Sequence, residues 1–565
     1  MQVLAATYYL SNFEYLLQFV VKQYKTILTS EEIAFTENFL QLSVSARCLY
    51  VRMANRKGNV FANNTLQYAE IPSTTEAIAE LEKQGFISKV NEQAIDFFEE
   101  IIQVFTKKEL LLFLQHCNPS LYKSSKTLKI KELHNTIFTN IPYTDFLQAI
   151  PITEIIIQKK TENVNFYKFL FFGNAHQDMT EFVLRDMGIV KFNTFADSQF
   201  TALFQSRAEA DEKWKILEIH HFLSTTLQAE NFSKHTNEIL EKIAIFFVNW
   251  FVENPLQYEI SSNAYQKLAI RLGNLFEKHK NYPNYLQISL DFYRYASISP
   301  SPERQTRILY HLGRYEESLA MCEAISQQPQ NATEASFAKD FGEKLQKMMQ
   351  KTSHKTIKEV SKYLKTAESI SVDKKYKNQV ENGVIAYYTE QGFSAIFVEN
   401  YIWRATFALL FWDIIFDSHI HQPFQKRPSD FYTKNFFEQR KHLFSKQLDE
   451  MQSKEKLQEI LEKNYQSKQG IQNPFILWHT VTLPLCVLLV ELLPIESLKK
   501  VLLVMAQDMK NALVGFPDIL IWKGKEYCWI EVKSPTDSLS AQQLFWLQFF
   551  TSNHIQAKVL RVLFV

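Results

Sequence analysis

Two carboxylates and a lysine near the carboxyl end of the chain have the types and spacing for metal-dependent hydrolysis. Asp518 precedes a short apolar run, and Glu531 and Lys533 lie near the end of a second one. The turn-forming residues between the two runs, at 523–526, predict a β-hairpin. In the register that this loop sets, Asp518 lies opposite Glu531, with Cβ atoms roughly 4.5–5.5 Å apart. Lys533 follows Glu531 by two positions, so it lies on the same face of the strand.

Two carboxylates this close repel each other, so one keeps its proton unless a cation neutralises the pair. Oxygen ligands of this kind suit Mg²⁺ or Mn²⁺, which bind carboxylates and retain several waters. One or two such ions could polarise a phosphodiester oxygen and acidify a bound water for attack. Lys533 could orient or deprotonate that water, or stabilise the charge that develops. Taken alone, the trio also fits a Glu–Lys ion pair at the end of a surface hairpin.

A longer pattern surrounds the trio. Gly-Phe-Pro-Asp-Ile-Leu-Ile-Trp at 515–522 is followed by Ile-Glu-Val-Lys-Ser-Pro-Thr-Asp-Ser-Leu at 530–539, and then by Gln543 and Trp546. This pattern resembles the VRR-NUC nuclease domain of the PD-(D/E)xK superfamily. The resemblance implies a helix over 540–550 behind the sheet and a final strand over 557–564. It also implies that metal is bound by Asp518, Glu531 and the carbonyl of Val532, with Lys533 as the catalytic lysine.

A further carboxylate lies upstream. Glu399 precedes a predicted helix, which leads into the run Trp-Asp-Ile-Ile-Phe at 412–416. This run resembles the Fanconi-associated nuclease family, in which a glutamate just before the helix completes the metal site, and Glu399 holds that position. From the residues alone, Glu399 is a carboxylate favoured at a helix amino terminus. We interpret Asp413, inside the apolar run, as a buried, hydrogen-bonded structural carboxylate.

The similarity to that family extends over most of the chain. Residues 49–58 and 66–71 match its amino-terminal region, and residues 105–110 and 128–133 are similar to its SAP-like helix–loop–helix. Residues 304–319 resemble a TPR-type helical hairpin. We therefore expect a bacterial-type homologue without the zinc-finger front end that some relatives carry.

Several positions depart from the family pattern. Ser534 replaces the glycine that usually follows Glu-Val-Lys, and Ser538 replaces a common arginine. Relatives also carry arginines ahead of Gly-x-Pro-Asp that are implicated in holding the DNA 5′ end. Here Lys510 is the only cation left, because Leu513 and Val514 are apolar. We therefore predict that phosphorylated and unphosphorylated 5′ ends are processed more equally than in those relatives.

Length and composition predict several domains. A chain of 565 residues holds about three or four domains of ordinary size. A content of 12 glycines disfavours an all-β architecture. We expect a mostly α multi-domain fold with a carboxyl-terminal α/β core of the PD-(D/E)xK, restriction-endonuclease-like type. The expected parts are an amino-terminal helical DNA-binding region (1–100), a SAP-like helix–loop–helix (101–145), a helical TPR-like domain (146–370) and a VRR-NUC nuclease domain (371–565). The charged segment 436–468 is expected to form one exposed helix.

The net charge of +1 requires any DNA-binding surface to be local. Two basic clusters and two single residues near the nuclease motif are candidates. The first cluster is Arg52, Arg56 and Lys57, the second is Lys123, Lys126, Lys129 and Lys131, and the single residues are Lys510 and Gln543. From the sequence, a solvated loop explains the second cluster equally well. Gln543 could support Lys533 or the substrate, and a helix-surface position explains it at least as well.

The expected partner is branched or flapped DNA and not a membrane. The longest apolar stretch, 483–495, contains Glu491 and is too short to span a bilayer. Five scattered cysteines without a Cys-x-x-Cys motif fit a reduced, cytoplasmic location, nucleoid-associated if the source is bacterial. The sequence leaves open whether two copies form a homodimer on DNA.

Together these patterns predict a metal-dependent DNA phosphodiester hydrolase. By the family resemblance it would be a 5′-flap endonuclease and 5′-to-3′ exonuclease of the phosphodiesterase I type, acting in DNA repair such as interstrand crosslink repair. The alternative is a DNA-binding repair scaffold with an inactive nuclease fold, which the near-zero charge, Leu513 and Ser538 favour. A sequence-specific, restriction-like enzyme would share the core chemistry. A glycosidase would also use two carboxylates, but it would not need Lys533.

Overall fold

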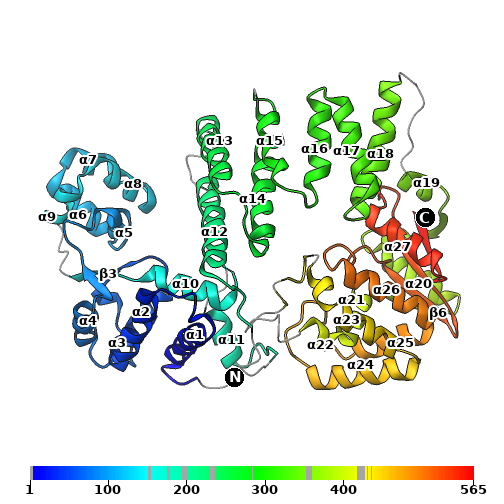
Figure 1. Cartoon of the computed structure of the whole chain (residues 1–565), viewed down its shortest axis with the longest axis horizontal. Coiled ribbons are helices and arrows are strands. Elements are labelled where there is room, and N and C mark those ends of the chain that lie inside the picture. Colours follow the sequence, from blue (N-terminus) through cyan, green and yellow to red (C-terminus); the bar gives the residue numbers. More distant parts are fainter. Residues whose placement is uncertain are drawn as a thin grey trace. The chain divides into compact units, whose positions relative to one another are not determined.

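The structure, a computed structural model, divides into two compact units, which are described separately (Figure 1). The first consists mainly of Met1–Lys191 and Phe195–Ala210, and the second mainly of Asp211–His421 and Gln425–Val565. The expected class, mostly helical with a carboxyl-terminal mixed sheet, is confirmed. The structure describes residues 4–149, 154–174, 179–193, 201–228, 236–282, 284–350, 359–416, 427–428, 430–433 and 435–565.

The amino-terminal unit packs helices around a small antiparallel sheet of order β1-β3-β2. The strands are β1 (Val60–Ala62), β2 (Ile87–Lys89) and β3 (Ile155–Gln158). The fully buried β3 pairs with both others, so residues beyond 150 complete a sheet begun within the first hundred. The helices around the sheet are α1 (Tyr8–Tyr24), α2 (Ser30–Gln41), α3 (Val44–Ala54), α4 (Thr74–Lys83), α10 (Thr161–Phe172) and α11 (Thr180–Asp186).

The segment expected to be SAP-like forms five short helices around one apolar core. These helices are α5 (Phe98–Gln103), α6 (Lys107–Cys117), α7 (Pro119–Ser125), α8 (Ile130–Asn140) and α9 (Tyr143–Ala149). Thr106 and Glu109 form a capping box that starts α6, and Leu114, Leu133 and Phe146 belong to the shared core. The packing explains why a short, lysine-rich segment holds a defined shape.

The second unit begins with a helical array, in which successive helices pack as antiparallel neighbours (Figure 1). Gly313 has a φ of 76° and allows the tight turn of the predicted helical hairpin over 304–319, which is confirmed. Gly273 lets α15 approach closely, because an added Cβ would lie 2.8 Å from the ring of Tyr293. The array comprises α12 (Arg207–Gln228), α13 (Thr236–Glu253), α14 (Glu259–Lys278), α15 (Tyr285–Arg294), α16 (Ser301–His311), α17 (Tyr315–Gln327) and α18 (Ala332–Met349). The short helix α19 (Glu359–Lys365) follows the array and packs against the carboxyl-terminal core.

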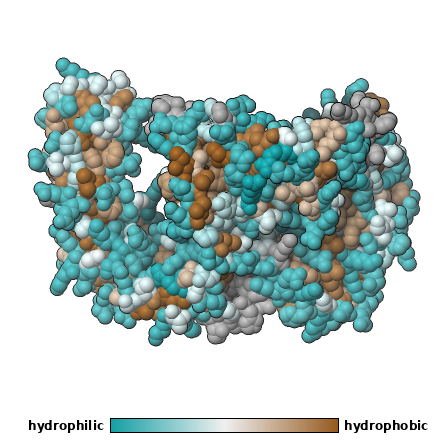
Figure 2. Space-filling model, turned by 45° about the horizontal axis from the view of Figure 1, so that its top comes forward, coloured by the Kyte–Doolittle hydropathy of each residue, from teal (hydrophilic) through white to brown (hydrophobic). Residues whose placement is uncertain are grey.

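Exposed apolar side chains gather on α13 and on the adjoining part of α12 (Figure 2). The most exposed are Ile245 and Val252, which lie on one face of α13. A contiguous apolar face of this kind is typical of contact surfaces. The side chains involved are Phe222, Ile245, Phe246, Val248 and Val252.

A five-stranded mixed sheet of order β4-β8-β7-β6-β5 forms the carboxyl-terminal core. The three strands β5, β6 and β7 are antiparallel neighbours, whereas β7, β8 and β4 run parallel. The predicted final strand over 557–564 is confirmed, and β4 brings residues 368–370 into the sheet from before the expected boundary. The strands are β4 (Glu368–Val372), β5 (Ser394–Phe397), β6 (Ile519–Lys523), β7 (Glu526–Lys533) and β8 (Ala557–Phe564).

Helices cover this sheet and hold its edges. Side chains of α20 (Val380–Glu390) share one core with the strands, and α27 (Ala541–Ser552) packs against β8. The predicted helix over 540–550 is therefore confirmed. The remaining helices are α21 (Tyr401–Leu410), α22 (Trp412–Ile415), α23 (Asn435–Glu450), α24 (Lys454–Lys468), α25 (Thr482–Leu492) and α26 (Ile495–Gln507).

Two sequence interpretations in this region are wrong. The segment 436–468 forms two helices and not one, because Met451 is buried at the break and Ser453 caps the second helix. Asp413 is not buried: its side chain is 79% exposed and pairs with Lys468 at 3.2 Å. Burial of Met451 within the charged segment, and the contact of Asp413 with the distant Lys468, decided these two conformations.

No helix within the described ranges is long and apolar enough to span a membrane.

Candidate active site

The predicted hairpin register is present. Trp522 pairs with Tyr527, and Ile519 pairs with Ile530, so one further step places Asp518 opposite Glu531. Lys523 also pairs with Glu526, which shortens the expected four-residue loop to a two-residue turn without changing the register. The local sequence therefore sets the two carboxylates face to face.

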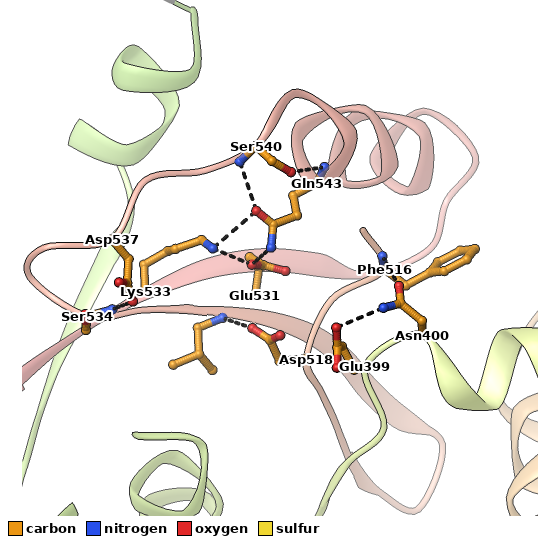
Figure 3. Close-up of polar contacts among 11 residues, drawn as sticks. Glu399, Asn400, Phe516, Asp518, Glu531, Lys533, Ser534, Asp537, Ser540 and Gln543 are labelled. Carbon is orange, nitrogen blue, oxygen red and sulfur yellow. Dashed lines mark hydrogen bonds and ion pairs between the residues drawn. The ribbon is translucent and has the colours of Figure 1, made fainter. Parts of the chain in front are cut away.

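Glu531 and Lys533 form a buried ion pair on β7 (Figure 3). The Lys533 Nζ donates to Glu531 Oε1 at 2.8 Å, and the same oxygen accepts from Gln543 Nε2 at 2.5 Å. The second oxygen, Glu531 Oε2, is buried and has no hydrogen-bond partner among the residues that the structure describes. An unpartnered buried carboxylate oxygen is costly unless something else binds it.

Asp518 is tied to two neighbouring segments by its own backbone and side chain. Its Oδ2 accepts from the backbone N–H of Val532 at 2.8 Å. Its carbonyl oxygen accepts from the N–H groups of Val398 and Glu399, each at 2.9 Å. Glu399 has a φ of 35°, in the left-handed region that is unusual for a side chain of its kind. These bonds bring Glu399 beside Asp518, as the family resemblance implies.

The carboxylate of Glu399 is exposed and held by an amide (Figure 3). Asn400 Nδ2 donates to Glu399 Oε1 at 2.9 Å, and Asn400 Oδ1 accepts from the N–H of Phe516 at 3.1 Å. Asn400 thus links Glu399 to the segment that leads into Asp518. The start of α21 shows no side-chain cap, so Glu399 does not act as a helix cap.

Burial and neighbouring negative charges raise the pKa values of the two carboxyl groups. Burial raises the pKa of Asp518 to about 6, against the opposing effects of the Val532 N–H and Lys533. Burial, followed by the charge of Asp518, raises the pKa of Glu531 to about 8. The charge of Glu399 raises both pKa values, and Glu381 at the start of α20 adds to that of Asp518. Glu381 carries no motif, so sequence reasoning missed it.

A hard divalent cation fits this set of donors, although the side chains are not assembled around one. Across the described ranges, no three His, Cys, Asp or Glu side chains lie close enough to form a ready metal site. Lys533 and Gln543 occupy one oxygen of Glu531, while Asn400 holds Glu399. The donors are nevertheless all oxygens, and one of them is buried without a partner. Burial is the main cause of both raised pKa values, so the ionised forms of these two carboxyl groups are disfavoured unless a cation lies beside them.

Aromatic packing fixes the segment before Asp518. Phe516 stacks on Trp546 with ring centroids 4.2 Å apart and on Trp403 at 5.1 Å. Trp546 Nε1 also donates to the carbonyl of Val514 at 3.1 Å. Gly515 has a φ of 83°, and an added Cβ would lie 3.0 Å from the backbone of Gln542. The Gly-Phe-Pro-Asp motif is therefore locked against α27.

The first basic cluster is only partly available. Arg52 donates to Glu70 Oε1 at 2.5 and 2.9 Å and lies over the rings of Tyr9 and Tyr68. These contacts give Arg52 a structural role and disfavour its predicted contact with DNA. Arg56 and Lys57 are exposed beside it.

The second cluster is exposed on α7 and α8 and in the loop between them. Lys123 and Lys126 lie on and directly after α7, whereas Lys129 and Lys131 lie at the start of α8. The ammonium of Lys126 is 4.5 Å from the centre of the Tyr122 ring. All four ammonium groups can therefore reach a partner from outside.

Lys510 has cationic neighbours that sequence reasoning did not identify. Desolvation, followed by the charges of Lys510 and Arg427, lowers the pKa of Lys267 on α14. Arg404 donates to the carbonyl of the buried Leu513 at 2.6 Å, so an arginine from α21 reaches this segment. No spacing rule connects these residues, because they come from separate helices and loops.

The sheet, its hairpin and the buried Asp–Glu–Lys group define a nuclease core of the restriction-endonuclease-like class. Residues 7–88 match the family described as FAN1, HTH domain, and residues 452–564 match the VRR-NUC domain. The Fanconi-associated nuclease 1 homolog of Pseudomonas aeruginosa is 25% identical, over 96% of this chain and 93% of its own length. The homolog of Arabidopsis thaliana is 26% identical, over 98% of this chain and 67% of its own.

The fold is shared with a solved protein. The crystal structure of paFAN1 bound to 2-nucleotide 5′-flap DNA with a gap superposes with a TM-score of 0.82 at 22% identity and covers 100% of both chains. In these two domains and along nearly its whole length, the chain is similar to Fanconi-associated nucleases.

Proposed function

We propose that this nuclease is a divalent-metal-dependent phosphodiesterase that cuts 5′-flap DNA and degrades free 5′ ends in the 5′-to-3′ direction. Its role would be in DNA repair, such as the repair of interstrand crosslinks. The observation that carries the proposal is Glu531, which is buried beside Asp518 with Oε2 free and Oε1 held by Lys533. Buried carboxylates in this state favour a cation over water.

Each residue of the site has a role in this proposal. Asp518, Glu531 and the carbonyl of Val532 would hold Mg²⁺ or Mn²⁺, with Glu399 as a further ligand. The ion, when bound, supplies charge to the phosphodiester oxygen and acidifies water. Lys533 is fixed by Glu531 Oε1 and is the cation that orients the attacking water or stabilises the developing charge.

The substrate class follows from relatives and from the distribution of charge. The structural neighbour paFAN1 holds 5′-flap DNA, and its fold covers the whole of this chain. The exposed cations that would contact DNA phosphates are Arg56, Lys57, Lys123, Lys126, Lys129, Lys131, Lys267, Arg427 and Lys510. A smaller difference between phosphorylated and unphosphorylated 5′ ends than in relatives stays a prediction.

Mapping cut positions tests this function against its alternatives. End-labelled flap substrates would place the same branch in unrelated sequences and different branches in the same sequence, with Mn²⁺ or with EDTA. We expect cuts that follow the branch and vanish with EDTA. Cuts that follow the bases would indicate a restriction-like enzyme. Binding without cutting in Mn²⁺ would instead support the scaffold with an inactive fold.

A further inference from the structure

Gln543 is the side chain that contacts both reactive groups of β7. Its Nε2 donates to Glu531 Oε1 at 2.5 Å, and its Oε1 accepts from Lys533 Nζ at 3.2 Å. The same Oε1 accepts from the backbone N–H of Ser540 at 2.9 Å (Figure 3). Both lone pairs of the amide oxygen and one N–H of the amide nitrogen therefore bind groups inside the protein.

These contacts decide which oxygen of Glu531 is free. Oε1 receives two donors, Lys533 Nζ and Gln543 Nε2, whereas Oε2 receives none although it is buried. A carboxylate without such a bias could turn about its last bond and exchange the two oxygens. The arrangement therefore presents a single oxygen to an incoming cation.

Helix capping alone does not explain a glutamine at this position. Ser540 Oγ accepts from the backbone N–H of Gln543, and Gln543 Oε1 accepts from the backbone N–H of Ser540. This reciprocal pair is a capping box. Glutamate serves this box as well as glutamine does. Only glutamine can also donate to Glu531, because a carboxylate has no N–H.

The capping box makes the contact rigid. It fixes the first turn of α27, and Leu544 and Leu547 of the same helix are buried against Val559 of β8. The amide of Gln543 is therefore aimed at Glu531 from a packed helix and not from a loop. Outer groups that hold metal-binding carboxylates in this way set metal affinity as well as geometry.

We propose that Gln543 is the positioning residue of the metal site: it holds Glu531 and Lys533 so that Glu531 offers Oε2 to the cation. The inference rests on the proposed function, because it assigns this task only if Glu531 binds metal. It differs from the sequence-based assignment of Gln543 to DNA contact, since the amide faces inward.

Mn²⁺ binding to the full-length protein, measured without DNA by the electron paramagnetic resonance of free Mn²⁺, tests the proposal. Gln543→Leu removes the donor and the acceptor, and we expect Mn²⁺ binding to weaken by about 10–100-fold. The value of kcat should fall while KM for flap DNA stays unchanged. The matched control is Gln548→Leu, which alters an exposed glutamine of the same helix.

A second control separates positioning from helix stability. Ser540→Ala removes the hydroxyl cap but keeps the backbone N–H that binds Gln543, so it should lower the melting temperature and leave Mn²⁺ affinity intact. Equal Mn²⁺ affinity of Gln543→Leu and Gln548→Leu would overturn the inference, as would a rise in KM alone. If the unaltered protein binds Mn²⁺ no better than Asp518→Ala, the proposed function itself fails.

Discussion

The nuclease sheet and the amino-terminal unit differ in how their carboxylates are paired with cations. In the sheet, Asp518 and Glu531 face each other, Lys533 pairs with Glu531, and both carboxyl pKa values are raised. In the amino-terminal unit, Arg52 is neutralised by Glu70 and covered by aromatic rings. The first group holds two buried carboxyl groups against one ammonium, and a metal ion would stabilise their ionised forms, whereas in the second the arginine and the glutamate pair one to one. Incomplete charge pairing therefore distinguishes the candidate site from a structural ion pair.

Replacing Lys533 should change catalysis more than any other substitution considered below. Lys533→Met removes the cation beside Glu531, so we expect kcat on flap DNA to fall by about 10²–10⁴-fold with binding retained. Single-turnover cleavage at saturating enzyme measures it. The control is Lys131→Met, an exposed lysine outside the sheet. A deficit that higher DNA concentration restores would count against a chemical role for Lys533.

The exposed lysines of the SAP-like helices should act on binding alone. Replacing Lys123, Lys126, Lys129 and Lys131 together with glutamine should weaken flap binding and leave kcat unchanged. The slope of log K against log salt should fall by about 0.9 for each phosphate contact that is lost. Binding measured at several salt concentrations checks this, and an unaltered slope would show that the four lysines face solvent only.

Arg52 should affect folding and not DNA binding. Arg52→Met leaves Glu70 and Tyr9 without their cationic partner, so we expect the amino-terminal unit to lose about 1–3 kcal/mol of stability. Denaturant melts of Arg52→Met, Glu70→Gln and the double variant measure the coupling between the two side chains. Weaker flap binding with unchanged stability would instead support the sequence-based prediction that Arg52 contacts DNA.

The pH dependence of metal-free stability should show the smallest effect. Because the pKa of Glu531 is raised from an ordinary value of about 4.3 to about 8, the folded state binds more protons between these values. This stabilisation is complete below the unfolded-state pKa and is lost as pH rises toward 8. Glu531→Gln cannot ionise, so it keeps this stability at high pH. In EDTA, its melting temperature minus that of the unaltered protein should therefore be larger at pH 8 than at pH 5. A difference that is independent of pH would contradict the raised pKa.

The hairpin was predictable because its information is local. Strand periodicity and the turn at 523–526 set the register, and the register alone opposes Asp518 to Glu531. The contacts of Gln543 and Asn400 depend on how α27 and α21 pack, which no local spacing states. The family resemblance placed Glu399, whereas its exposure and its left-handed φ followed only from the structure.

Errors arose where one distant contact decided the outcome. Asp413 lies in an apolar run but turns outward to Lys468, and the charged segment 436–468 breaks where Met451 enters the core. Lys267 and Arg427 approach Lys510 only through tertiary packing. The partners of a charged surface residue can therefore be assigned only when the tertiary structure is known.

The most direct test of the central claim compares the unaltered protein with Asp518→Ala on an end-labelled 5′-flap DNA in Mn²⁺. Binding of both proteins to the same DNA is measured in parallel. The account predicts branch-directed cutting by the unaltered protein and none by Asp518→Ala, with equal binding by both. Cutting by Asp518→Ala at the unaltered rate would show that the hairpin carboxylates do not perform the chemistry.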